Sequence, residues 1–295
     1  MSSKKILITG ATGQLGFELA QLADQFKQFE FILLDRSILD LSKPDLFDSI
    51  IHKYQPDYII NTAAYTAVDK AESEHALATL INSTAVATLA RIAKNNGIRF
   101  ITFSTDYVFN GHSTAPYTTD ESLDPINFYG KTKADGEILA MTINPNSIII
   151  RTSWVFSSHG NNFVKTMLRL MKDRESLNVV ADQKGRPTYA KDLALATMGI
   201  VIAIEKGQQV SGVFHYANKG VTTWHAFAEK IKHNAGLSCQ INPITTNEFP
   251  TPAKRPGYSV LDTSRIENEL GLTIPDWEDA LLDCQKKLDA INVSQ

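Results

Sequence analysis

The sequence predicts an α/β protein that combines a doubly wound parallel sheet with a smaller α/β lobe. Short apolar strand patterns alternate with amphipathic helix patterns up to about residue 151, a glycine-rich turn separates the first strand from the first helix, and polar side chains gather where the strands end. Strands joined by helices form right-handed crossovers and a parallel sheet. Ligands of such sheets bind at the carboxyl ends of the strands, so we expect a site there.

The size and composition are typical of a soluble globular protein. The 295 residues suffice for one large α/β domain with an appended lobe or for two domains. The net charge of -3 and the pI near 6.2 predict no general attraction to nucleic acid or to anionic membranes. Two distant cysteines indicate neither a disulfide framework nor a zinc site. We recognise no leader peptide and no long apolar run, so we expect a cytoplasmic protein.

The first strand and the turn after it predict a dinucleotide site. Residues 4–9 form a short buried strand, three glycines follow with the spacing G-x-x-G-x-x-G, and an amphipathic run occupies residues 17–26. Glycines permit a tight turn and a close backbone approach, and the amino end of the helix then faces a pyrophosphate. The cofactor contacts predicted in this turn are Gly10, Thr12, Gly13, Gln14 and Leu15.

The end of the second strand, residues 29–34, bears on the choice of cofactor. Asp35 stands where an acid binds the adenosine ribose 2′-OH of NAD, and the neighbouring Arg36 could pair with the 2′-phosphate of NADP. We therefore predict that either NADPH or NADH is used. In the loop that follows, Asp40 and Leu41 are predicted to contact the adenine end, although Asp40 fits a helix cap before Pro44 equally well.

Two further strand ends complete the predicted site. The third strand, residues 57–61, leads into Ala63 and Ala64, whose small side chains allow the backbone to approach the cofactor ribose. A helix reaching about residue 96 precedes a fourth strand at 98–103, and Ser104-Thr105-Asp106 follows it.

Tyr129 and Lys133 open the next helix. They are four residues apart and share one helix face, so a phenol and an ammonium can act on the same substrate atom. Such a pair is common on amphipathic helices, where it has no catalytic role. Its place in the strand-end layer favours a proton-transfer site here.

The regular alternation of strand and helix patterns weakens after a fifth strand at residues 147–151. We predict a dinucleotide-binding domain over residues 1–151 and a mainly substrate-binding lobe over 152–295. Trp154, just past a strand end, could stack on a sugar or a base, or pack at a domain junction. Arg186 and Arg255 lie in loops bounded by proline and glycine, where a guanidinium could grip a diphosphate or simply be solvated.

These motifs resemble those of the extended short-chain dehydrogenase/reductases. The resemblance rests on the glycine turn, NTAA at 61–64, STDYVF at 104–109 and the pair Tyr129-x-x-x-Lys133. Three more stretches are similar to the dTDP-4-dehydrorhamnose reductase family: AYTAVDKAE at 64–72, DQKGRPT at 182–188 and RPGYSVLD at 255–262. The likeness spans residue 4 to about residue 288. It implies a Rossmann-like sheet to which segments of the second half return.

The resemblance implies that Thr105, Tyr129 and Lys133 form a catalytic set, with Tyr129 and Lys133 also touching the cofactor. The implied reaction reduces the C4 keto group of dTDP-4-dehydro-L-rhamnose to give dTDP-L-rhamnose. A nicotinamide supplies hydride and Tyr129 donates the proton. Because a phenol's ordinary pKa is about 10, we expect Lys133 to favour the phenolate. Thr105 would donate a hydrogen bond to the developing oxyanion.

Other roles follow from matching positions. The resemblance places Thr66 and Val68 near the substrate and favours a substrate role for Trp154. Asp106 and Tyr107 could reach the sugar or shape the turn that follows. Asn82, not counted among the site residues, could join a proton relay or be structural.

We predict no functional metal, and a monomer or a homodimer. Some relatives bind magnesium through acids at a dimer contact; Glu18 matches one such position, but Lys191 occupies another. Two alternatives stay open. One is another nucleotide-sugar reductase or epimerase of the same family, and the other is a non-catalytic subunit similar to that of methionine adenosyltransferase. Loss of Tyr129 or Lys133 would favour the second, and both are present.

Overall fold

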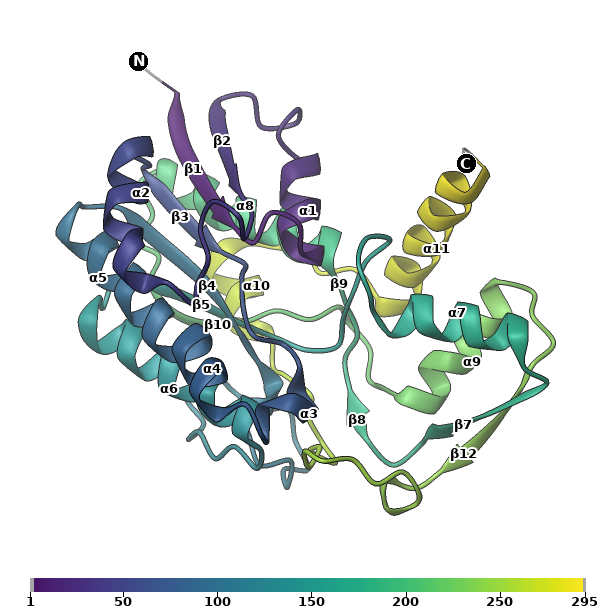
Figure 1. Ribbon diagram of the computed structural model, residues 1–295. Coiled ribbons are helices and arrows are strands. Elements are labelled where there is room, and N and C mark those ends of the chain that lie inside the picture. The colour runs from purple at the N-terminus through teal and green to yellow at the C-terminus, as the bar shows by residue number, and fades with distance from the viewer. Residues whose placement is uncertain (1–2, 294–295) are drawn as a thin grey trace.

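The computed structural model describes residues 3–293, which form two lobes (Figure 1). The larger lobe is built on a six-stranded sheet with the order β10-β5-β4-β3-β1-β2, and every pairing in it is parallel. The predicted doubly wound parallel sheet is therefore confirmed. Its strands are β1 (Lys4–Thr9), β2 (Phe29–Leu34), β3 (Tyr58–Asn61), β4 (Arg99–Thr105), β5 (Ile148–Thr152) and β10 (Gly212–His215).

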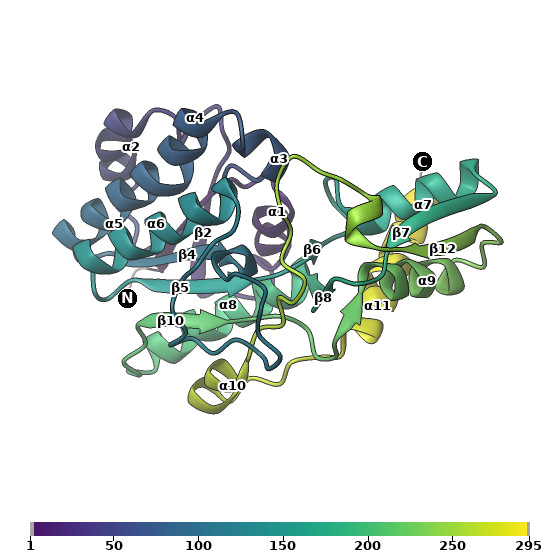
Figure 2. The same cartoon turned by 90° about the horizontal axis from the view of Figure 1, so that it is seen from below.

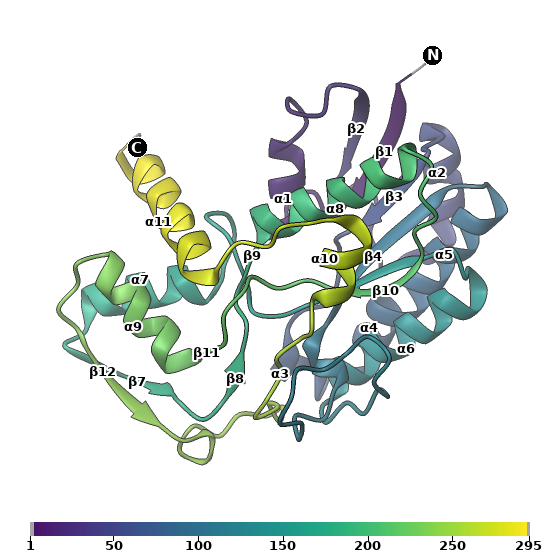
Figure 3. The same ribbon diagram turned by 180° about the vertical axis from the view of Figure 1, so that it is seen from behind.

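Helices cover both faces of this sheet. Figure 3 shows α1, α8 and α10 over one face, and Figure 2 shows α2, α5 and α6 over the other. Strand order reverses beside β1, which has β2 on one side and β3 on the other, so the crevice typical of doubly wound folds opens at the carboxyl end of β1. The helices are α1 (Gln14–Gln21), α2 (Phe47–Tyr54), α5 (Ala85–Asn95), α6 (Phe128–Ile143), α8 (Ala190–Glu205) and α10 (Ser264–Leu270).

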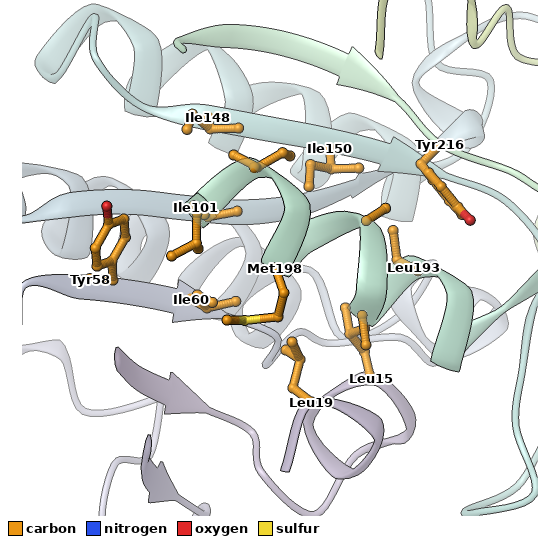
Figure 4. Packing of buried hydrophobic residues seen from close by; sticks show 14 of the residues in the cluster. Leu15, Leu19, Tyr58, Ile60, Ile101, Ile148, Ile150, Leu193, Met198 and Tyr216 are labelled. Carbon is orange, nitrogen blue, oxygen red and sulfur yellow. The ribbon is translucent and has the colours of Figure 1, made fainter. Parts of the chain in front are cut away.

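The sheet is buried on both faces, and this explains its strand sequences. Ile6, Leu7 and Ile8 of β1 are all fully buried, so the strand is a continuous apolar run rather than an alternating one. Figure 4 shows the core on one face, where side chains of α1 and α8 pack against the sheet. A second core fills the face covered by α2 and α5.

The long helix predicted to end near residue 96 is interrupted. It consists of α4 (His75–Thr79), a π-helical turn at Leu80–Thr84 and α5, and the short α3 (Val68–Ala71) precedes it. The span His75–Asn95 is long and apolar enough to cross a membrane, but 56% of its apolar window is buried inside the protein. It packs as a core helix of the larger lobe.

The smaller lobe has its own apolar core and three short sheets, which pair β6 with β9, β7 with β12 and β8 with β11. Cys239 and Cys284 are buried in that core and free. Its helices are α7 (Phe163–Asp173), α9 (Trp224–Asn234) and α11 (Trp277–Val293); its strands are β6 (Val155–Phe156), β7 (Ser176–Val180), β8 (Lys184–Gly185), β9 (Thr188–Tyr189), β11 (Thr222–Thr223) and β12 (Gln240–Ile244). The later chain also returns to the larger lobe, because α8, β10 and α10 pack on or join the six-stranded sheet.

Candidate active site

A pocket of about 460 Å³ lies at the carboxyl ends of β1, β3, β4 and β5. It gathers nine of the predicted site residues, which come from the glycine turn, the end of β3 and the start of α6: Gly10, Gly13, Gln14, Leu15, Ala63, Ala64, Thr66, Tyr129 and Lys133. The opposite wall includes Val155, Gly160 and Asn161, which no sequence motif indicated. These three belong to the second half of the chain, so the pocket lies between the two lobes.

The glycine turn is shaped for close backbone packing. Gly10 has φ +65, and a Cβ placed on it would lie 2.8 Å from the backbone nitrogen of Ala63. A Cβ on Gly16 would lie 2.3 Å from the carbonyl oxygen of Gly10. Helix α1 begins at Gln14, inside the motif rather than at the predicted residue 17, and its N-cap Gly13 offers no capping side chain. The first N–H groups of α1 are thereby left for a pyrophosphate.

Asp35 and Arg36 stand at the end of β2, outside the lining of this pocket. One carboxylate oxygen of Asp35 accepts hydrogen bonds from the backbone nitrogen and the hydroxyl of Ser37, at 2.8 and 2.5 Å. These bonds hold the pKa of Asp35 below its ordinary value. The Arg36 side chain is 76% exposed, and its Nε lies 3.6 Å from Asp40. It is free to turn towards a 2′-phosphate.

Asp40, in the loop after β2, does not act as the helix cap considered for it. Its carboxylate accepts from the backbone nitrogen and the hydroxyl of Ser42, both at 2.9 Å, and so folds its own turn. The 3₁₀ turn Pro44–Leu46 has Lys43 as its N-cap, so Asp40 does not cap it. Leu41 is buried in the core and does not line the pocket.

Helix α6 presents Tyr129 and Lys133 to the pocket. The N-cap Asn127 accepts from the backbone nitrogen of Gly130 at 2.7 Å, which places Tyr129 in the first turn. Lys133 is buried, and its Nζ donates to the carbonyl oxygen of Phe103 at 2.7 Å. The two functional groups are thus held by a helix cap and by the neighbouring strand β4.

Burial shifts the pKa values of both members of this pair. Burial raises the pKa of Tyr129 to about 12, against the opposing effect of a hydrogen bond with Thr105. Burial lowers the pKa of Lys133 to about 8, while Glu137 acts in the opposite direction. For Tyr129, desolvation outweighs the opposing effect of Thr105, and the neutral phenol is favoured in the free protein. The neutral phenol that results is the form that can donate a proton.

Strand β4 is longer than predicted and carries Thr105 as its last residue. The Thr105 hydroxyl donates to Asp106 at 3.0 Å and accepts from the backbone nitrogen of Tyr107 at 3.2 Å. Asp106 is buried, and burial raises its pKa to about 6 against the opposing effects of Ser259 and Thr105. The Tyr107 ring meets Tyr129 edge to face at 6.0 Å. Asp106 and Tyr107 thus shape the turn and also adjoin Tyr129.

Asn82 acts as a structural clamp. Its side chain bonds the backbone nitrogen and oxygen of Tyr65 at 2.9 and 3.0 Å, and donates to Thr132 at 3.1 Å. A Cβ on Gly136 would lie 2.1 Å from the Asn82 carbonyl oxygen, so α6 packs closely here. Of the two roles considered for Asn82, this geometry favours the structural one.

The two arginines predicted to grip a diphosphate differ in their surroundings. Arg255 forms a bidentate ion pair with Asp69, with Nη–Oδ distances of 2.6 and 2.8 Å. The Nε of Arg186 is buried without a partner among the described residues, and burial lowers the pKa of this guanidinium. A buried guanidinium with an unpaired donor is suited to an anionic ligand. Nearby, Trp154 has φ +48 and stacks on Trp224 at 3.6 Å.

A second pocket of about 280 Å³ opens between the smaller lobe and α3. Its walls are mostly apolar or aromatic, with amide, hydroxyl and two charged groups between them, as is common in sites for small organic ligands. Its residues come from five separate stretches of the chain, and no local sequence signal joins them. They are Asp69, Phe163, Met167, Asn178, Val179, Val180, Gln183, Trp224, Phe249, Thr251 and Arg255.

Glu18, which matches a magnesium ligand of some relatives, is bonded to other side chains of this protein. The buried carboxylate of Glu18 accepts from Ser157 at 2.6 Å and from Lys287 at 3.1 Å. Lys191 pairs with Asp283. Between residues 3 and 293 there is no group of three or more His, Cys, Asp or Glu side chains that could hold a metal ion.

Comparison with known proteins identifies close relatives. Residues 4–290 match the family model described as RmlD substrate binding domain. The chain is 43% identical over 287 residues to a dTDP-4-dehydrorhamnose reductase of Aggregatibacter actinomycetemcomitans, covering 94% of this chain and 97% of that protein. It is 41% identical over 279 residues to the spore coat polysaccharide biosynthesis protein SpsK of Bacillus subtilis, with 94% and 95% covered.

Solved structures agree with these relatives. A dTDP-4-dehydrorhamnose reductase from Clostridium acetobutylicum has a TM-score of 0.91 and 39% identity, covering 97% of this chain and 99% of that one. One from Bacillus anthracis, solved in complex with NADP, has a TM-score of 0.90 and 35% identity, with the same coverage.

Proposed function

The chain belongs to the RmlD substrate binding domain family, and from that premise we propose that it reduces the C4 keto group of dTDP-4-dehydro-L-rhamnose to dTDP-L-rhamnose with NADPH or NADH. One observation carries the proposal beyond family membership. Tyr129 and Lys133 line the same pocket as the glycine turn, so a proton donor faces the site expected for a nicotinamide cofactor. Reduction of a carbonyl needs a hydride donor at the carbon and a proton donor at the oxygen of the same bond.

In the proposed reaction the side chains act on the oxygen. A reduced nicotinamide bound in the pocket would supply the hydride to C4. Tyr129, held as a neutral phenol by burial, gives its proton to the oxygen as charge develops there. Thr105 turns its hydroxyl proton from Asp106 to the same oxygen. Lys133, fixed to the Phe103 carbonyl, provides the cation that stabilises the tyrosine once it has lost its proton.

The proposed reaction is tested directly by mixing the purified protein with NADPH and the keto-sugar nucleotide. We expect the absorbance of the reduced nicotinamide to fall, and NMR to show the C4 configuration of L-rhamnose in the product. A product of the opposite C4 configuration would identify a different nucleotide-sugar reductase. No turnover with NADPH or NADH would refute the proposal.

Arg36 is proposed to bind the 2′-phosphate of NADPH. Because its side chain is exposed and only loosely paired with Asp40, Arg36→Ala should raise the KM for NADPH about tenfold and leave the KM for NADH within about twofold. Steady-state kinetics with each cofactor measure both values. Lys94→Ala, which removes another exposed cation, serves as the control. Equal changes for the two cofactors would argue against the 2′-phosphate contact.

The second pocket is proposed to hold the thymine base, with Phe249 as an aromatic wall that is 56% exposed in the free protein. Phe249→Ala should raise the KM for the sugar nucleotide about fivefold, the low end of what stacking on a base contributes, without changing the KM for NADPH. Ile138→Ala removes a side chain that is 55% exposed on α6 and is the matched control. An unchanged KM in Phe249→Ala would place the base elsewhere.

A further inference from the structure

The Asp69 carboxylate links α3 to the chain of the smaller lobe. Asp69 accepts three hydrogen bonds from the segment 251–257, called the strap below: from the backbone nitrogen of Ala253 at 3.1 Å and from Nη1 and Nη2 of Arg255 at 2.6 and 2.8 Å. Nη1 of Arg255 also donates to the carbonyl oxygen of Ala253 at 2.7 Å. The guanidinium plane is therefore fixed from two sides.

The strap is also tied to the catalytic helix. Asn127, which caps α6 with its side-chain oxygen, donates from its side-chain nitrogen to the carbonyl oxygen of Lys254 at 2.8 Å. Gly111 packs so closely on Pro256 that an added Cβ would lie 2.5 Å from its ring. Figure 2 shows this part of the chain passing α3 between the lobes. A shift of the strap would thus disturb the start of α6, next to Tyr129.

The Asp69–Arg255 pair stands between the two pockets. Thr66 lines the first pocket, and Asp69, three residues later, lines the second together with Arg255. The guanidinium also interacts with the phenol of Tyr107, whose ring contacts Tyr129. A nucleotide sugar that puts its keto carbon beside Tyr129 and its base in the second pocket must pass its diphosphate along this edge.

We infer that Asp69 is a positioning residue, which holds the Arg255 guanidinium at the junction of the two pockets for the diphosphate of the substrate; this rests on the proposed function. A guanidinium has five N–H donors, and Asp69 and Ala253 take three of them. Even with the contact to Tyr107, one donor stays available on a group that has already lost its rotational freedom. Binding to a preorganised arginine loses less conformational entropy than binding to a mobile one.

The carboxylate has an opposite effect as well, because it repels the diphosphate. If Asp69 only paired with Arg255 until the substrate displaced it, the pair would weaken substrate binding. Removing the Asp69 carboxylate would then tighten substrate binding. The three bonds to the strap argue for a permanent arrangement, since displacement would break the Ala253 contact as well as both contacts to Arg255. The two readings predict opposite signs for one measurement.

The test uses full-length Asp69→Asn, Arg255→Gln and the double variant. Calorimetry gives the Kd for dTDP, and kinetics give kcat and the KM for the sugar nucleotide. We expect each single variant to raise both constants about tenfold with kcat within about threefold, and the double variant to be no worse than either single one. Asp135→Asn, which breaks the exposed Lys131–Asp135 pair on α6, is the matched control and should change neither constant.

An unchanged or lowered Kd for dTDP in Asp69→Asn would overturn the inference, as would additive effects in the double variant. An unchanged Kd for NADPH shows that each variant is folded. Should Asp69→Asn fold poorly, Asp69→Glu decides in its place: it keeps the negative charge but moves the carboxylate away from Arg255 and Ala253, so it must raise the Kd for dTDP. Failure of the proposed function is recognised separately: the wild-type protein would then neither bind dTDP nor oxidise NADPH with the keto sugar.

Discussion

Tyr129→Phe should lower kcat by about 10²–10⁴-fold, the range in which a positioned acid contributes to catalysis. The substitution removes only the phenolic oxygen, which is the proposed proton donor, and leaves the ring that packs against Tyr107. When hydride adds to C4, no acid would then be in place to protonate the carbonyl oxygen. Water in the pocket is a poorly placed substitute. The Kd for NADPH should stay within about twofold of the wild-type value, because the lost proton acts only during the reaction.

Single-turnover measurements with saturating NADPH separate this loss from product release. Tyr54→Phe, on α2 and away from the pocket, is the matched loss of a phenol and should retain full activity. If Tyr129→Phe turns over at the wild-type rate, Tyr129 is not the proton donor, even though the fold and the family stand.

Glu137→Gln should destabilise the protein by about 3–5 kcal/mol, because it leaves a buried guanidinium without its counter-charge. Glu137 lies one turn beyond Lys133 on α6, and both oxygens of its carboxylate bind Arg151 at 2.7–3.0 Å. The two side chains are only 5% and 4% exposed. Arg151 also donates to His215 at 3.2 Å, so the charge cannot move into solvent without breaking the packing between β5 and β10.

Urea denaturation followed by circular dichroism measures the free energy of unfolding. Asp135→Asn, which breaks an exposed ion pair on the same helix, should cost no more than about 1 kcal/mol. The double variant Glu137→Leu/Arg151→Met removes both charges and should be less destabilised than Glu137→Gln. Equal losses for Glu137→Gln and Asp135→Asn would contradict the importance of this buried pair.

Local patterns in the sequence were sufficient for the fold and for much of the pocket. The three glycines after β1 and the small residues Ala63 and Ala64 after β3 predicted close backbone packing, and a Cβ on Gly10 would indeed collide with Ala63. These signals are readable because a strand, a tight turn or a helix face imposes its own period or residue type on neighbouring positions. The family motifs extended the prediction to the reaction, and the relatives confirm the family.

Contacts between distant parts of the chain were decided only by the tertiary structure. Asp69 and Arg255 are 186 positions apart, and their pairing changes an arginine that was free in the prediction into one that is held in place. Packing likewise gave Asn82 its role as a clamp and kept the Tyr129 phenol protonated. The sequence by itself determined the parallel sheet, the glycine turn and the family, because these depend on neighbours along the chain. Ion pairs, desolvation and the second pocket depend on which elements meet in space.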